Sequence, residues 1–246
     1  MFFLLVVSGV LCLPAVQAQQ GAQSVETIVR WNKQFVGIVI ARSARDATVR
    51  LGTVFLTNRQ GFAITSARVV ASSPSSLILL RFPGCPAMPV LSVHYSTGDV
   101  AVLRVAADIC TFHTPPVEPS NPFPQNRSGF AFAGAKSVQE GQQVLVIGFL
   151  RPDDFGSGAA TVATGIVRAV REDAMLIQAP IGAGTSGAPV LNMLGEVVGM
   201  VGGTSTGDQR GLDFATPANK LQLEFCYALQ AEKVLTTSDQ FLKCLP

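Results

Sequence analysis

Residues 178 to 200 read Gln-Ala-Pro-Ile-Gly-Ala-Gly-Thr-Ser-Gly-Ala-Pro-Val-Leu-Asn-Met-Leu-Gly-Glu-Val-Val-Gly-Met. Ser186 lies here among Gly182, Gly184 and Gly187, so that backbone N–H groups can turn toward the seryl oxygen and form an oxyanion-binding site. Two apolar runs follow, separated by a turn, which is typical of a β-hairpin. A tight glycine-rich loop that feeds a hairpin is one way to present a nucleophilic serine.

Two other motifs fit this loop only in part. Its glycines spell G-x-G-x-x-G, but the dinucleotide-binding motif requires a helix directly after it, and Pro189 with the β-type run that follows argues against a helix. The nucleophile elbow of α/β-hydrolases requires a histidine after the serine. His94 and His113, the two histidines of the chain, both precede Ser186. The order that remains is base, acid, serine.

Short runs rich in Val, Ile, Leu and Phe, separated by Gly, Pro, Asn and Ser, predict an all-β fold. In the first half they cover residues 35–41, 49–56, 62–65, 77–82 and 100–105, and in the second half 144–149, 161–170, 175–178, 190–191, 197–201 and 212–216. Five prolines between residues 114 and 124 mark a boundary, because such a stretch continues neither a helix nor a sheet. From Pro217 onward the apolar spacing favours a C-terminal helix docked on the second unit.

The chain resembles the protease domain of the HtrA (DegP-like) branch of the chymotrypsin-fold serine proteases over roughly residues 35 to 220. Besides the serine loop, five segments carry this resemblance in the family's order: Gly52–Val70, Ser96–Val105, Gly141–Gly148, Ala163–Val170 and Gly211–Pro217. The resemblance implies two six-stranded antiparallel β-barrels with the site in the crevice between them. The expected organisation is an N-terminal barrel over residues 19–113, a linker over 114–128, a second barrel over 129–217, and a helix with a disulfide-bonded tail over 218–246.

The resemblance also assigns roles to individual residues. It places the nucleophile at Ser186, the acid at Asp99 and the oxyanion hole at the backbone of Gly184, Thr185 and Ser186. In the family the residue after Ser66-Ala67 is the general-base histidine, and here that residue is Arg68.

This departure decides the functional interpretation. A guanidinium group has five donors and no acceptor and stays protonated at physiological pH, so Arg68 cannot take a proton from Ser186. It can instead form an ion pair with Asp99. We therefore expect a protease-like protein without proteolytic activity that binds a protein or peptide partner in the crevice. Two alternatives are a weak or unconventional serine endopeptidase or esterase, with another base such as His94 acting on Ser186, and a structural or carrier protein.

Substrate preference follows from the same resemblance. The floor of the substrate pocket falls at Pro180 beside Ile181, and the last matching segment adds Phe214 and Ala215. None of these residues carries a carboxylate, so any residual binding should favour small aliphatic side chains. Ala188 replaces a family glycine two residues after the serine, and the sequence does not show whether the loop keeps its shape.

Residues 1–18 are uncharged and apolar and end in small residues, which is typical of a secretory signal peptide. A signal anchor is the alternative, although the run is short and lacks flanking charges. We therefore expect a secreted protein that makes no use of a membrane after cleavage.

Composition limits the remaining function classes. With 246 residues, 48% of them hydrophobic and 14% charged, the chain can bury a large core. A net charge of +2 without a basic run argues against nucleic-acid binding. No cofactor or metal is expected, because no C-x-x-C spacing exists.

Four cysteines remain after Cys12 leaves with the signal peptide: Cys85, Cys110, Cys226 and Cys244. Four cysteines allow three pairings. We favour Cys85 with Cys110 and Cys226 with Cys244, because each pair then lies within one structural unit. Asn126 begins an Asn-Arg-Ser glycosylation sequon in the linker.

Overall fold

The computed structural model describes residues 23–57, 61–96, 98–106, 122–124, 127–134, 137–149, 152–204 and 212–246. The expected signal peptide, most of the proline-rich linker, Cys110, His113 and Asn126 lie outside these described residues.

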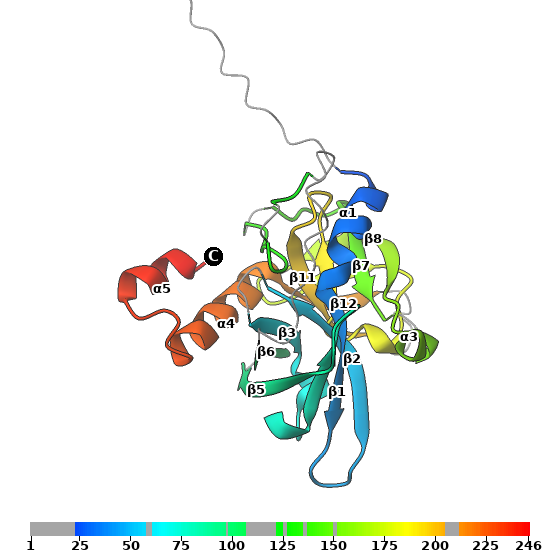
Figure 1. Ribbon diagram of the computed structural model, residues 1–246. Helices are drawn as coiled ribbons and strands as arrows, with labels where there is room; N and C mark the ends of the chain where they lie inside the picture. The colour runs from blue at the N-terminus through cyan, green and yellow to red at the C-terminus, as the bar shows by residue number, and fades with distance from the viewer. Residues whose placement is uncertain are drawn as a thin grey trace, which may run out of the picture.

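The described strands form two closed six-stranded barrels, as predicted, with every neighbouring pair antiparallel (Figure 1). In the first barrel the order is β1-β2-β3-β6-β5-β4, and in the second it is β10-β11-β12-β9-β8-β7. The strands of the first barrel are β1 (Val36–Arg42), β2 (Val49–Leu56), β3 (Phe62–Ser66), β4 (Ile78–Arg81), β5 (Met88–Tyr95) and β6 (Val100–Val105). Those of the second are β7 (Gln143–Gly148), β8 (Thr161–Val170), β9 (Met175–Gln178), β10 (Pro189–Leu191), β11 (Val197–Thr204) and β12 (Asp213–Pro217).

Strand β5 is the one strand of these barrels that the apolar pattern did not indicate. It contains Pro89, and Ser92 and His94 interrupt its second half, which has no buried residue, so it lacks the continuous apolar run that marks its neighbours. Its pairing with β6 also shifts register between Val90 and Ser92, as in a β-bulge. Closure of the barrel, rather than local sequence preference, accounts for this strand.

Helices precede, connect and follow the strands of the two barrels. They are α1 (Val25–Asn32), η1 (Lys33–Phe35), α2 (Ala67–Val70), η2 (Ser75–Leu77), α3 (Pro152–Ser157), η4 (Ala183–Thr185), α4 (Ala218–Ala231) and α5 (Ser238–Cys244). Helix α1, which the sequence did not predict, lies beside the second barrel (Figure 1), where Gln23 N donates to Met193 O at 2.9 Å. Arg127 holds the C-terminal end of α1 by donating hydrogen bonds to Asn32 Oδ1 at 2.8 Å and to Trp31 O at 2.7 Å. Burial lowers the pKa of Arg127 to about 10.

The expected C-terminal helix, α4, lies across both barrels rather than on the second alone. Phe225 packs edge-to-face on Phe62 of β3, with ring centroids 5.8 Å apart. Lys220 pairs with Asp173 in the turn between β8 and β9 of the second barrel. The predicted Cys226–Cys244 disulfide is present and ties α5 back to α4.

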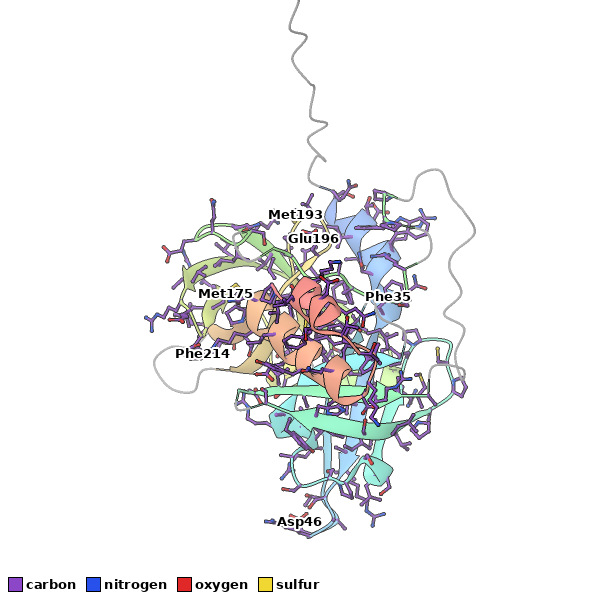
Figure 2. All side chains as sticks on the ribbon, turned by 90° about the vertical axis from the view of Figure 1, so that its left-hand side faces the viewer. Phe35, Asp46, Met175, Met193, Glu196 and Phe214 are labelled. Carbon is purple, nitrogen blue, oxygen red and sulfur yellow. A yellow bond between two sulfur atoms is a disulfide. The ribbon has the colours of Figure 1, made fainter. Side chains whose placement is uncertain are left out.

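Figure 2 shows how far the first barrel extends from the second. Asp46 lies at the tip of the β1–β2 hairpin, at the opposite end of the molecule from Met193 and Glu196 of the β10–β11 turn. Hydrogen bonds from Ser43 and Thr48 lower the pKa of Asp46 to about 2.

The C-terminal end of α4 is held to the first barrel by a polar contact. Glu232, the residue that ends the helix, accepts hydrogen bonds from Ser92 Oγ and from His94 Nε2, the latter at 2.7 Å. The hydrogen bond from Ser92, followed by the interactions with His94, lowers the pKa of Glu232. A lowered folded-state pKa means that this contact stabilises the protein above the unfolded-state pKa and that the stabilisation is lost as pH falls through the folded value.

We predict that Glu232→Gln lowers the free energy of unfolding at pH 7 by about 1 kcal/mol, the usual net contribution of such hydrogen bonds. The difference from the natural protein should shrink as pH falls below about 4 and disappear below the lowered pKa of the folded state, where the carboxylate is protonated in both states. Urea denaturation at a series of pH values measures this. Glu140→Gln, which removes the same charge from an exposed turn, is the control and should show neither effect. A pH-independent loss in Glu232→Gln would contradict the prediction.

Candidate active site

Arg68 and Asp99 form an ion pair at the edge of the first barrel. Strand β3 ends at Ser66, and the chain turns directly into α2, so that Arg68 projects from the first turn of this helix beside the residue that precedes β6. Arg68 Nη2 and Nε donate to Asp99 Oδ2 at 2.6 and 2.9 Å. The Arg68 side chain is 62% exposed, whereas that of Asp99 is 21% exposed. The sequence reasoning that placed these two residues together is therefore supported by their geometry.

The remaining hydrogen-bonding capacity of Asp99 is also occupied. The hydroxyl of Ser66, which is fully buried, donates to the carboxylate at 2.8 and 2.9 Å from its two oxygens. The backbone N–H of Arg68 donates to Oδ1 at 3.1 Å. Each carboxylate oxygen thus accepts at least two hydrogen bonds, which leaves little capacity to orient another base.

Gly202 of β11 brings the second barrel against this pair. A Cβ on Gly202 would lie 3.2 Å from Asp99 Oδ2 and 3.3 Å from Arg68 Nη2. Most Cβ atoms in proteins keep a greater distance from their neighbours than this. The absence of a side chain therefore lets β11 approach the ion pair from the other barrel. Sequence reasoning did not single out this glycine, because nothing local marks it as part of the site.

The serine loop lies against the same part of the first barrel. Residue Gly187 has φ +89°, and a Cβ there would lie 2.1 Å from Thr53 O and 3.0 Å from Ser66 N. Its N–H donates to Val201 O at 2.8 Å, next to Gly202. Half-buried Ser186 is therefore placed in the neighbourhood of Arg68 and Asp99, as the order of segments predicted.

Thr53 of β2 anchors the serine loop. Its backbone N–H donates to Ser186 O at 2.9 Å, and its hydroxyl donates to Gly184 O at 3.1 Å and accepts from Phe149 N at 3.2 Å. Its carbonyl accepts a hydrogen bond from the Thr65 hydroxyl at 2.7 Å. Thr53 is fully buried and joins residues more than 90 positions away in sequence. The sequence carries no signal for this role, since one threonine in a strand has no distinguishing pattern.

The expected oxyanion hole differs in one respect from the structure. The residues before Ser186 form the 3₁₀ turn η4, in which the N–H of Thr185 donates to Gly182 O at 3.1 Å. This N–H is therefore not available to a substrate oxygen. The Ser186 hydroxyl donates no hydrogen bond to the described part of the chain, so it remains open to solvent or a ligand.

The serine loop keeps a regular hydrogen-bonded shape with alanine at position 188. The residue is fully buried, its N–H donates to Thr185 O at 2.7 Å, and its carbonyl accepts from Val201 N at 2.9 Å. The methyl group fits because it faces Gly148: a Cβ on that glycine would lie 2.9 Å from the Cβ of Ala188. The loop thus accommodates alanine where the family has glycine.

The four residues expected to form a substrate pocket line two different cavities. Pro180 and Ile181 line one of about 570 Å³ together with Asp154 and Thr161. Phe214 and Ala215 line another, of about 560 Å³, which also contains Arg68 and Asp99. The prediction of a single pocket from these four residues is therefore not reproduced, because β12 and the chain after β9 face different hollows.

His94, the candidate for a replacement base, is bound to Glu232 at the end of α4, as described above.

Among the described residues no group of three or more His, Cys, Asp or Glu side chains gathers that could hold a metal ion. Among the helices of the described residues, none is long and apolar enough to cross a membrane.

Comparisons with known proteins agree with the fold. The family model for the trypsin-like peptidase domain matches residues 52–200. A search of curated proteins finds no significant match.

Three solved structures resemble the fold at low sequence identity. The Rv3671c protease from M. tuberculosis, in its active form, is 23% identical with a TM-score of 0.61, covering 79% of this chain and 80% of that one. The HtrA-type protease AlgW with a tripeptide is 20% identical (TM-score 0.63), covering 84% of this chain and 63% of that one. The serine endoprotease from Yersinia pestis is 22% identical (TM-score 0.60), covering 87% and 66%.

We predict that Thr53→Val lowers the free energy of unfolding by about 1–3 kcal/mol, because the buried Gly184 carbonyl and Phe149 N–H lose their partner. Urea denaturation measures the change. Thr48→Val, which removes an exposed hydroxyl from the β1–β2 hairpin, is the matched control and should change stability by less than about 0.5 kcal/mol. Equal effects of the two substitutions would refute the role given to Thr53.

We also expect Gly187→Ala to be more damaging than Gly141→Ala. Both glycines have positive φ, at +89° and +83°, so each alanine incurs backbone strain of about 1 kcal/mol. A Cβ at Gly141 meets nothing within 4 Å, whereas at Gly187 it must displace backbone atoms. Thermal unfolding should show an additional cost of about 2 kcal/mol at Gly187. Similar melting temperatures for the two variants would show that the loop can move away at little cost.

Proposed function

Because the chain belongs to the trypsin-like peptidase family, we propose that it is a proteolytically inactive member that binds a protein or peptide partner in the crevice between its barrels. The observation that carries the proposal is the ion pair at the position where the family has its base. Arg68 Nη2 lies 2.6 Å from Asp99 Oδ2, and its Nε and backbone N–H bond to the same carboxylate.

Two physical arguments support inactivity. A guanidinium cannot accept the proton that Ser186 must lose before it attacks a carbonyl. Asp99, which would orient a histidine, already has both oxygens engaged by Arg68 and Ser66. In another serine protease, removal of the base alone lowers kcat by about a millionfold, or roughly 8 kcal/mol of barrier.

The described part of the chain offers no obvious substitute for the base. His94 lies on β5 and bonds through Nε2 to Glu232 at the end of α4, so its use would require that contact to break. The binding role rests on what remains: a folded serine loop, an exposed Arg68, a cavity lined by Arg68 and Asp99, and a second cavity lined by Pro180 and Ile181.

Hydrolysis of casein tests the proposal directly. The protein without residues 1–18 should be inert, as should its Ser186→Ala variant. Arg68→His should gain hydrolysis, because it restores a proton acceptor beside Asp99. Adding Ser186→Ala to Arg68→His should abolish this gain.

Labelling by a fluorophosphonate, followed by mass spectrometry, reports on Ser186 reactivity independently of substrate choice. It should label Arg68→His and leave the natural protein unlabelled. If the natural protein cleaves casein and Ser186→Ala stops the cleavage, the proposal is wrong and another proton acceptor must serve Ser186.

A further inference from the structure

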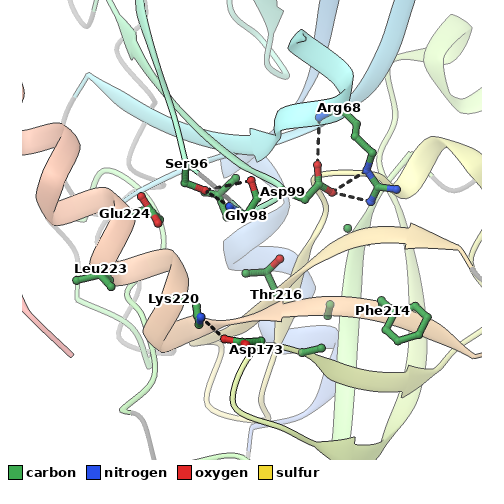
Figure 3. Close-up of a pocket in the computed structure, with 14 residues that line it drawn as sticks. Arg68, Ser96, Gly98, Asp99, Asp173, Phe214, Thr216, Lys220, Leu223 and Glu224 are labelled. Carbon is green, nitrogen blue, oxygen red and sulfur yellow. Dashed lines mark hydrogen bonds and ion pairs between the residues drawn. The ribbon is translucent and has the colours of Figure 1, made fainter.

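A groove of about 560 Å³ separates the Arg68–Asp99 pair from helix α4 (Figure 3). One wall comes from the first barrel and carries Arg68 and Asp99. The opposite wall comes from β12 and α4 and carries Lys220 and Glu224, with Asp173 from the β8–β9 turn at its edge. We call this hollow the α4 groove.

The charges that line the α4 groove do not cancel. Arg68 pairs with Asp99, and Lys220 pairs with Asp173, so that each cation already has an anion of its own. Glu224 is left over: its half-buried carboxylate makes no hydrogen bond or ion pair within the described part of the chain. The groove therefore carries a net charge of about −1 that is concentrated on one side chain.

The electrostatics of Glu224 show the cost of this arrangement. Burial raises the pKa of Glu224, and the nearby Lys220 only partly offsets this. A carboxylate that loses hydration without gaining a partner is less stable in its charged form. An added cation would relieve this cost.

The rest of the lining suits an alkyl chain. Half-buried Leu223 contributes aliphatic surface next to Glu224 in the helix. The other apolar residues of the lining are Phe214, which is 44% exposed, and the buried Val100 and Ala215. Lys and Arg side chains lay their methylene stems on such surfaces and keep the charged end against a carboxylate.

We propose that the α4 groove binds a lysine or arginine side chain of the partner polypeptide, with its cation on Glu224 and its stem against Leu223. The proposal rests on the proposed function, since the groove opens beside Arg68 and the partner would occupy the adjoining crevice. It gives the partner a basic residue, although the residues first expected to form the substrate pocket favour small aliphatic side chains.

An acidic ligand suits the groove less well. The Lys220 ammonium and the Arg68 guanidinium each already face a carboxylate, so an incoming anion would have to displace Asp173 or Asp99. It would also approach the unpaired charge of Glu224, which repels it.

The test uses two peptides that differ by one charge. Acetyl-Ala-Ala-Arg-Ala-Ala-amide carries a guanidinium, and the same peptide with citrulline has the same shape without the charge. Dissociation constants for the natural protein, for Glu224→Gln and for Glu140→Gln are measured by NMR titration at low salt. Glu140→Gln removes a carboxylate from an exposed turn outside the groove and serves as the matched control.

We expect the natural protein and Glu140→Gln to bind the arginine peptide roughly tenfold more tightly than the citrulline peptide, the effect of one partly desolvated ion pair. Glu224→Gln should bind both peptides equally. Added salt should reduce the preference in the natural protein. Absence of a preference in the natural protein, or its persistence in Glu224→Gln, would overturn the proposal.

Mass spectrometry of the peptides after titration separates this proposal from the proposed function. Intact peptides with no preference for arginine would refute the groove while leaving inactivity in place. Cleaved peptides would refute inactivity, and the charge preference measured in the Ser186→Ala background would still decide whether Glu224 recognises the cation.

Discussion

The buried hydroxyl and backbone of Thr53 hold the two barrels in the relation on which the site depends. This residue belongs to β2 of the first barrel, yet it bonds to Gly184 and Ser186 of the serine loop and to Phe149 at the end of β7. A side chain at Gly187 would collide with its carbonyl oxygen. Because buried polar groups must be paired, the loop cannot leave Thr53 without leaving several donors and acceptors unsatisfied. The position of Ser186 is thus fixed by the neighbouring barrel.

The hydrogen bonds to the Asp99 carboxylate are a second constraint on the site. The Asp99 carboxylate accepts hydrogen bonds from Ser66, from the Arg68 backbone and from the Arg68 guanidinium. In water such an exposed ion pair contributes little to stability, about 0–1 kcal/mol. In the function proposed above its importance is chemical, because it occupies the carboxylate that would otherwise orient a base. The fold thus accommodates an arginine at position 68 with the Asp99 carboxylate fully hydrogen-bonded.

The sequence predicted those parts of the structure that leave a local pattern. Apolar runs and the ordered segments gave both barrels, and the spacing of the segments brought Arg68 and Asp99 together. Strand β5 was missed because Ser92 and His94 interrupt its second half, and its conformation is imposed by closure of the barrel. The roles of Thr53 and Glu224 arise from contacts or unpaired charge that depend on the whole fold. No window of neighbouring residues could reveal them.

Helix α4 is attached to a different barrel at each end. Near its start Lys220 pairs with Asp173 of the second barrel, and at its end Glu232 accepts hydrogen bonds from Ser92 and His94 of the first. Between these attachments the 14-residue helix spans the junction of the two barrels, a length of about 21 Å at 1.5 Å of rise per residue. The helix therefore joins the two barrels outside the crevice, in addition to the contacts of Thr53 within it. A substitution at Glu232, Ser92 or His94 would therefore remove one attachment of the helix without touching any residue that lines the α4 groove.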